Sequence, residues 1–247
     1  MNKEIFENAK RLRLAYLKDN SATIIAEAVD NKPSYEDFIS NILKLELIDR
    51  ENKSIKKHIN SAGFPNLLNF DQLDLKVFSE DVQRIIEQVK TLEFITNGQN
   101  IIMCGNPGVG KTHIATALGL LACQKNMSVL YTSVPNLIID LKEKAETNSL
   151  GSFKRKFCSY DLVILDELGY ITFDKGASEL LFNLLSTRNQ NKSIIITTNL
   201  SFNRWNEIFG DEVLTAAMVD RITYKAYVMN ITGQSYRIKE TKEWLRN

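Results

Sequence analysis

One segment of the chain has the residue types and spacing of a phosphate-binding loop. It matches the pattern G-x-x-x-x-G-K-[ST] between an apolar run and a helical stretch. Glycines let backbone N–H groups converge on phosphate oxygens, and the N-terminus of the helix adds partial positive charge. The alternative, a glycine-rich turn that binds no ligand, accounts less well for a strand before the loop and a helix after it. The segment predicts a nucleotide site made by Gly105, Asn106, Pro107, Gly108, Val109, Gly110, Lys111, Thr112 and His113.

Two side chains of this loop have expected roles in binding. Lys111 is spaced to reach the β and γ phosphates of a nucleotide, and the hydroxyl of Thr112 is spaced to bind Mg²⁺. The sequence therefore predicts ATP and Mg²⁺ as the cofactors.

A second apolar run ends in two carboxylates, Asp166 and Glu167. Because ligands lie at the carboxyl ends of strands in open α/β sheets, Asp166 is expected beside the loop, where it would hold Mg²⁺ through water. Glu167 would polarise a water molecule for in-line attack on the γ-phosphate. An acidic strand end in solvent is the alternative for the pair taken alone. The pair lies far enough after Lys111 for one intervening strand, and this position favours the nucleotide site and hydrolysis.

A third polar residue, Asn199, follows another apolar run. An amide at the tip of a strand between the two phosphate-binding elements can orient the attacking water next to Glu167. An asparagine that simply forms a turn after a strand fits the spacing equally well. Both interpretations of Asn199 stay open on spacing alone.

The elements that must position these residues are short apolar runs separated by helical segments. Strands without alternation are buried on both faces, and strands that alternate with helices form a parallel sheet between helices. The predicted fold is α/β and doubly wound, with a five-stranded parallel sheet. The strands are expected at 101–104, 129–132, 162–165, 194–197 and 227–231.

The chain before the sheet has a different pattern. Apolar residues recur at helical spacing from Asn2 to about Lys57, and Ser34 is expected to cap the helix that follows Pro33. The next stretch has neither the helical nor the strand periodicity of apolar residues, and it contains Gly63. The sequence therefore predicts a small all-helical N-terminal domain at 1–60, a linker at 61–78 and an ATPase domain at 79–247.

Composition and charge exclude several classes of protein. The 247 residues are 44% hydrophobic and 25% charged, which excludes disordered chains and small disulfide scaffolds. Lys plus Arg number 31 and Asp plus Glu 30, so no global positive field indicates nucleic acid. The first residues are too charged for an export signal, and no apolar run is long enough to span a membrane. We expect a cytoplasmic protein with no membrane partner.

Together the motifs resemble the ATPase core of IstB-type transposition helper proteins. The resemblance covers roughly residues 60–240 in order, and its later segments are more specific than the phosphate loop. It implies an AAA+ P-loop NTPase of the initiator and helicase-loader clade. The segments are Asn106–His113 with Ala115 and Ala117, Tyr160–Tyr170, Thr197–Leu200, Phe202, Trp205, Phe209–Asp211, Val219–Arg221 and Ser235–Arg237.

The resemblance also implies a function and roles for particular side chains. It implies an ATP-dependent assembly of many subunits that binds DNA and that recruits and stimulates a partner transposase. Asn199 would be the sensor-1 residue, and Arg221 would be an arginine finger that enters a neighbouring subunit's site. Arg237 would be a sensor-2-like arginine. Without the resemblance, a surface ion pair would be the expected role of both arginines.

The segment between the second and third strands is longer than a simple crossover requires and is rich in lysine. In initiator-clade ATPases a helix at this place follows phosphate backbones, so Lys154, Arg155 and Lys156 are the expected DNA contacts. A solvated helix face is an equally good interpretation. No base-reading motif occurs, so DNA binding is expected to be largely independent of sequence. The N-terminal helices are a second candidate for binding DNA, the transposase or a neighbouring subunit.

Three other functions fit part of the pattern. A DnaC-type replicative helicase loader shares the core motifs and would differ in its N-terminal domain. A non-hydrolysing scaffold would use ATP only to hold a DNA-binding oligomer together. A P-loop kinase fits poorly, because it needs no glutamate at the position of Glu167.

Overall fold

The computed structural model describes residues 3–188 and 192–245. The chain divides into two compact units, residues 1–57 and 58–247. Within the described residues, no helix is both long and apolar enough to cross a membrane.

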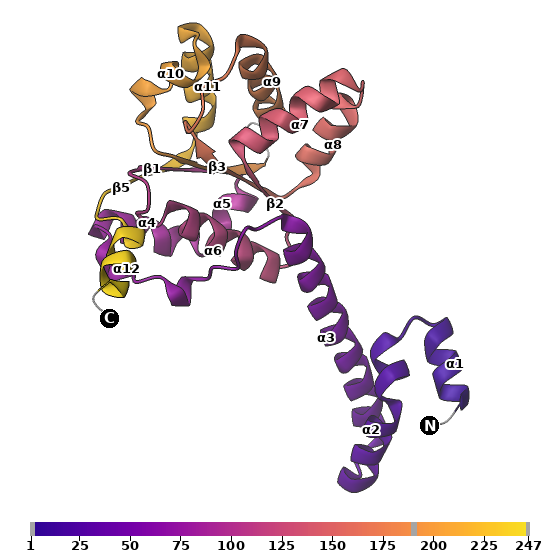
Figure 1. Ribbon diagram of the computed structural model, residues 1–247. Helices are drawn as coiled ribbons and strands as arrows, with labels where there is room; N and C mark the ends of the chain where they lie inside the picture. Colours follow the sequence, from indigo (N-terminus) through magenta and orange to yellow (C-terminus); the bar gives the residue numbers. More distant parts are fainter. Residues whose placement is uncertain (1–2, 189–191, 246–247) are drawn as a thin grey trace. The chain divides into compact units, whose positions relative to one another are not determined.

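Helices α1 (Lys3–Arg11), α2 (Ala15–Asn31) and the first part of α3 (Tyr35–Ala62) make up the first unit (Figure 1). The Ser34 hydroxyl accepts the backbone N–H of Asp37 at 3.1 Å, which confirms Ser34 as a cap. The buried Glu46 carboxylate of α3 accepts the N–H groups of Ala15 and Tyr16 at 3.0 and 2.9 Å. Glu46 therefore supplies the cap that Leu14 cannot provide for α2.

The second unit is built on a five-stranded parallel sheet in the order β2-β3-β4-β1-β5. Each strand contains one of the apolar runs predicted to be a strand, so the predicted α/β fold is confirmed. The order leaves β2 and β5 at the two edges. The strands are β1 (Asn100–Gly105), β2 (Val129–Ser133), β3 (Leu162–Leu168), β4 (Ser193–Thr198) and β5 (Ala226–Ile231).

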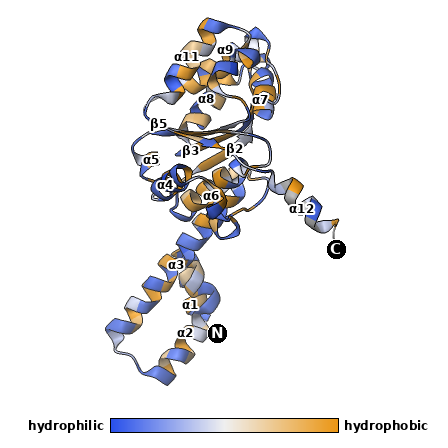
Figure 2. Cartoon of the chain, turned by 90° about the vertical axis from the view of Figure 1, so that its left-hand side faces the viewer, coloured by the Kyte–Doolittle hydropathy of each residue, from blue (hydrophilic) through white to orange (hydrophobic). Residues whose placement is uncertain are grey.

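Helices cover both faces of the sheet, because successive strand residues point to opposite sides. In β1, Ile101 and Met103 join the core on one face, and Ile102 and Cys104 join the core on the other. Figure 2 shows the strands as a hydrophobic layer between the helices. One face carries α4 (Glu80–Val89), α5 (Glu93–Thr96) and α6 (Lys111–Gln124). The other carries α7 (Val134–Glu146), α8 (Leu150–Ser159), α9 (Lys175–Ser186), α10 (Asn206–Phe209) and α11 (Glu212–Thr223).

The segment predicted as a linker packs against the rest of the second unit. It contains two short 3-10 helices, η1 (Phe70–Gln72) and η2 (Leu75–Val77), and its Leu73 and Phe78 side chains belong to the core beneath α6. The ring of Phe64 lies 6.1 Å from that of Tyr131 on β2, centroid to centroid. A third such helix, η3 (Phe202–Arg204), precedes α10, and α12 (Tyr236–Trp244) follows β5.

Candidate nucleotide site

The phosphate loop joins β1 to α6 and depends on two glycines. Gly105 has a φ of 153°, and a Cβ atom on it would lie 2.0 Å from the carbonyl oxygen of Ile231. Gly108 has a φ of 80°, and a Cβ atom there would lie 2.1 Å from Ser235 Oγ. Because neither position has room for a side chain, the loop can adopt this path only with glycine.

Lys111 begins α6, and its side chain is held within the loop. It is only 6% exposed, and its Nζ donates hydrogen bonds to the carbonyl oxygens of Gly105 and Asn106 at 2.7 and 2.8 Å. The ammonium group therefore lies at the N-terminus of α6. Positive charge at that point favours phosphate.

Three hydroxyl groups converge on the carboxylate of Asp166, which is 2% exposed. Thr112 Oγ1 lies 3.2 and 3.0 Å from its two oxygens, and Tyr131 and Thr197 also donate hydrogen bonds to it. Burial, together with the bond to Asp166, raises the pKa of the Tyr131 phenol, so this group stays protonated at neutral pH. Thr112 and Asp166 present oxygen ligands, which Mg²⁺ prefers, so this pair fits the predicted metal.

Glu167 follows Asp166 but is exposed. Both residues lie in a bulge of β3. The pairing of β3 with β4 shifts between Leu165 and Leu168, and Glu167 has a φ of 66°. Its backbone N–H donates to Thr197 Oγ1 at 3.1 Å. Left-handed backbone at a residue other than glycine is costly and persists only where the surrounding structure holds it in place. The bulge leaves Asp166 buried and places Glu167 in the wall of the site cavity.

The residue at the tip of β4 that contacts the Asp166 carboxylate and the Glu167 backbone is Thr197. Asn199 lies further along, and its Oδ1 would be 3.0 Å from a Cβ atom on Gly169. This oxygen is buried and has no hydrogen-bond partner among the described residues. Asn199 therefore approaches the turn after Glu167, and its expected role in orienting the attacking water stays a prediction.

A cavity of about 480 Å³ joins these groups into one site. The phosphate loop, Asp166, Glu167 and Thr197 form one side of it, and residues of the predicted linker, including Asn66, Leu68 and Gln72, form the other. His113 Nε2 lies 2.7 Å from the carbonyl oxygen of Asn69, which ties the segment to the start of α6. The linker contribution had no sequence signal, because this stretch has neither a motif nor a period.

A smaller cavity of about 120 Å³ lies beside Val109 of the loop. Val77 and Phe78 border it on one side, and Gly233 and Tyr236 border it on the other. The backbone N–H of Tyr236 donates to the carbonyl oxygen of Gly108 at 2.9 Å. The start of α12 is thus fixed directly on the phosphate loop. Arg237 lies in α12, and its side chain is outside the part that the structure describes.

Arg221 lies at the end of the sheet opposite the phosphate loop. The next residue, Ile222, is held by Asn100, whose Nδ2 donates to the Ile222 carbonyl oxygen at 3.1 Å. Asn100 begins β1 and Gly105 ends it, so the two ends are about 17 Å apart at the usual strand rise. Arg221 donates a hydrogen bond to Ser186, and its guanidinium lies 4.5 Å from the centroid of the Phe182 ring. It is therefore not part of its own chain's nucleotide site.

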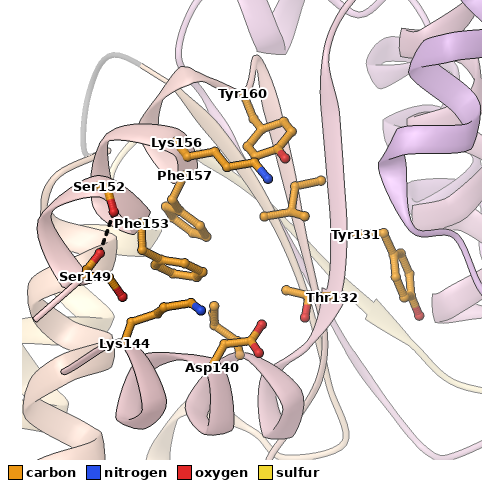
Figure 3. A pocket seen from close by; sticks show the side chains of 12 residues that line it. Tyr131, Thr132, Asp140, Lys144, Ser149, Ser152, Phe153, Lys156, Phe157 and Tyr160 are labelled. Atoms are coloured by element: carbon orange, nitrogen blue, oxygen red, sulfur yellow. Dashed lines mark hydrogen bonds between the residues drawn. The ribbon is translucent and has the colours of Figure 1, made fainter. Parts of the chain in front are cut away.

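The predicted DNA contacts lie on α8 but do not face one way. Lys156 lines a cavity between α7, α8 and β2 (Figure 3), whereas Lys154 and Arg155 are not among its lining residues. Arg155 and Lys156 are exposed, and Lys154 is partly exposed. Lys156 therefore belongs to the cavity, and Lys154 and Arg155 lie outside its lining.

The strand order, the loop after the first strand and the acidic pair on the third define a P-loop NTPase of the AAA+ type. The chain also matches the family model described as IstB-like ATP binding protein over residues 7–244. It belongs to this family, as the resemblance predicted.

Similar proteins agree with this assignment. The ATP-binding protein of insertion sequence IS5376 from Geobacillus stearothermophilus is 30% identical, over 98% of this chain and 96% of its own. The corresponding protein of IS232 from Bacillus thuringiensis subsp. berliner is 32% identical, over 96% and 95%. Among solved structures, a DnaC helicase loader is similar with a TM-score of 0.56 and 23% identity, over 66% of this chain and 96% of that one. DnaA bound to AMPPCP and single-stranded DNA has a TM-score of 0.60 and 17% identity, over 74% and 56%.

Proposed function

We propose that this protein hydrolyses ATP and uses the nucleotide to assemble on DNA for a partner transposase. The observation that carries the proposal is the convergence of Lys111, Thr112, Asp166 and Glu167 on one cavity. Relatives named as ATP-binding proteins of insertion sequences support the nucleotide and the transposition context.

Each of these residues has a step that its position suits. Lys111 would hold the β and γ phosphates, and the cavity beside Val109 would accept the adenine base. Thr112 and Asp166 would hold Mg²⁺, which supplies positive charge to the phosphate oxygens when bound. Glu167 would accept a proton from the water that attacks the γ-phosphate. Thr197 would keep the Asp166 carboxylate and the Glu167 backbone in place through its two hydrogen bonds.

The test of hydrolysis is the variant Glu167→Gln. We expect ATP turnover to fall by about 10²–10⁴, the usual contribution of a general base, while ATP binding is retained. Glu179→Gln, an exposed glutamate on α9, is the matched control and should leave turnover unchanged. Normal turnover in Glu167→Gln would remove the proposed base.

We also propose that Arg221 acts in a neighbouring subunit. Its position at the far end of its own sheet supports a role in trans, and Phe182 and Ser186 hold the guanidinium at that surface. Arg221→Ala should lose turnover, and mixing it with Lys111→Ala should restore part of it. The mixed assembly contains intact loops facing intact arginines, so an absence of any recovery would argue against the role in trans.

DNA binding is proposed for the cations of α8, chiefly Lys154 and Arg155, with Lys156 at the margin. The DnaA structure with single-stranded DNA supports nucleic-acid binding by this fold class. Lys154→Glu with Arg155→Glu should weaken duplex DNA binding at every sequence and reduce its salt dependence. Lys125→Glu, an exposed lysine after α6, is the control. Equal affinity of both variants would place the DNA elsewhere.

Similarity of fold to the DnaC loader makes a replicative helicase the alternative partner. Purified protein loaded with ATP should retain the transposase of the same insertion element and not the replicative helicase. The reverse result would favour helicase loading.

A further inference from the structure

A cavity of about 560 Å³ lies between α7, α8 and the edge strand β2, and we call it the α7–α8 cavity. Figure 3 shows the rings of Phe153 and Phe157 in its wall and Tyr160 at one end. Leu130 and Leu137 add further apolar surface to its lining. Tyr131 extends to the other side of the strand, toward the nucleotide site, so the cavity is separate from that site.

The walls of the cavity are held in place by contacts outside it. Arg188 is 1% exposed, and its guanidinium donates to the carbonyl oxygens of Phe157 and Tyr160 at 2.6 and 2.9 Å. Burial lowers the pKa of Arg188 to about 10, which still leaves it charged at neutral pH. Lys142 of α7 forms an ion pair with Asp174 before α9. A binding site that is already formed loses less entropy when a ligand enters.

The floor of the cavity is formed by β2, the strand at one edge of the sheet. Within the part of the chain that the structure describes, β2 pairs with β3 alone. Three consecutive residues of β2, Leu130–Thr132, line the cavity. Because successive strand residues point to opposite faces, Leu130 and Thr132 face α7 and α8. The edge itself is partly covered, since a Cβ atom on Gly63 would lie 3.2 Å from the carbonyl oxygen of Tyr131. Side chains of β2 therefore make the floor of the cavity.

The cavity also carries an excess of positive charge. Figure 3 shows the Nζ atoms of Lys144 and Lys156 reaching into it from α7 and α8. Neither lysine forms an ion pair with a described residue. Asp140 is the acidic residue of the lining, so two ammonium groups face one carboxylate. An anionic ligand with apolar parts complements this surface.

We propose that the α7–α8 cavity binds an extended segment of a partner protein in which an apolar residue is flanked by acidic residues. The apolar side chain of the segment packs on Phe153 and Leu137, and its carboxylates meet Lys144 and Lys156. The proposal goes beyond ATP hydrolysis and DNA binding and requires neither.

A peptide fits this cavity better than DNA does. Duplex DNA presents phosphates and sugars, which gain nothing from a wall of phenylalanine rings. A base could enter only after leaving its stack, which costs free energy. The cations that do suit DNA, Lys154 and Arg155, are not part of the lining.

The test uses a displayed library of random linear peptides, selected on the full-length protein with ATP. We expect enriched peptides to combine Asp or Glu with Phe, Leu or Ile. Synthetic copies should lose at least about tenfold in affinity on Lys144→Glu with Lys156→Glu. The matched control, Lys154→Glu with Arg155→Glu, reverses the same charge on α8 outside the cavity and should keep peptide affinity. ATP binding and melting temperature establish that each variant is folded.

Charge reversal in the peptide makes the test independent of variant stability. A copy with Lys in place of its acidic residues should bind Lys144→Glu with Lys156→Glu more tightly than it binds the unaltered protein. Enriched peptides without acidic residues, or peptides that bind all variants equally, would overturn the proposal. Competition of duplex DNA with the peptides, lost in Lys144→Glu with Lys156→Glu, would assign the cavity to nucleic acid instead. Failure of DNA binding in the control variant bears only on the proposed function.

Discussion

The two ends of the sheet both bury polar side chains but use them differently. At the amino ends of the strands, Asn100 donates to the carbonyl oxygen of Ile222 and accepts the N–H of Ile194, at 3.1 and 3.0 Å. Ser193 donates to the carbonyl oxygen of Phe94 at 2.9 Å. The space beside Asn100 is only about 10 Å³. These side chains satisfy main-chain groups and leave no room for a ligand.

At the carboxyl ends, the buried polar groups are side chains that converge on another side chain. Thr112, Tyr131 and Thr197 all donate to Asp166, beside a cavity of about 480 Å³. Taking a carboxylate out of water is costly, and hydroxyl donors offset only part of that cost, so this arrangement is expected to reduce stability. Buried polar side chains therefore stabilise the fold where they bond to main-chain groups. They serve function where several of them meet beside a cavity.

Asp166→Asn should produce the largest effect and separate activity from stability. We expect Mg²⁺-dependent ATP turnover to fall at least about a hundredfold, since even residues behind a metal ligand contribute tenfold or more. The free energy of unfolding should not fall by more than about 1 kcal/mol, because the variant removes a buried charge. Turnover and urea unfolding measure the two quantities. A large loss of stability would show that Asp166 resembles the polar groups at the other end.

Asn100→Leu should show the opposite behaviour. It leaves the N–H of Ile194 and the carbonyl of Ile222 buried without partners, which should cost about 2–4 kcal/mol of unfolding free energy. Turnover for each folded molecule should remain normal. Urea unfolding and turnover normalised to the folded fraction provide the check. If Asn100→Leu kept its stability but lost turnover, the two ends of the sheet would not differ in the proposed way.

Thr197→Val keeps the shape of the side chain and removes two hydrogen bonds at the functional end. We expect about a tenfold loss of turnover, because Asp166 and the Glu167 backbone both lose a partner. Thr197→Ser retains the hydroxyl and should recover most of the activity. Equal turnover in Val and Ser variants would leave Thr197 without a positioning role.

Tyr131→Phe should produce the smallest effect, seen mainly as a change in pH dependence. The phenol has a folded-state pKa above its ordinary value of 10.0. Its contribution to stability is therefore complete below pH 10 and is lost as pH rises toward the folded-state pKa. The variant should lose less stability than the unaltered protein when unfolding is measured from about pH 9 to 11. Parallel pH profiles would separate Tyr131 from the Asp166 network.

The strands and the phosphate loop could be predicted because their signals are local. Apolar runs such as 162–165 identify buried strands, and the glycines and Lys111 of the loop occur at fixed spacing. The acidic pair followed from its place at the end of such a run, and the family resemblance added the expected roles of Asn199, Arg221 and Arg237. Thr197, Tyr131 and the segment 63–78 could not be found in this way, because their contacts join residues far apart in sequence. Thr197 and Asp166, for example, meet only because β3 and β4 are neighbours.

The sequence by itself determined the fold class, the nucleotide loop and the family, since periodicity and motif spacing are properties of neighbouring residues. Only the tertiary structure decided which polar residues meet. It placed Thr197 against the Asp166 carboxylate and the Glu167 backbone, Arg221 at the far end of the sheet, and Lys156 in the lining of the α7–α8 cavity. The physical reason is that strand order, the bulge at Glu167 and the packing of α8 against Arg188 result from the burial of the whole second unit.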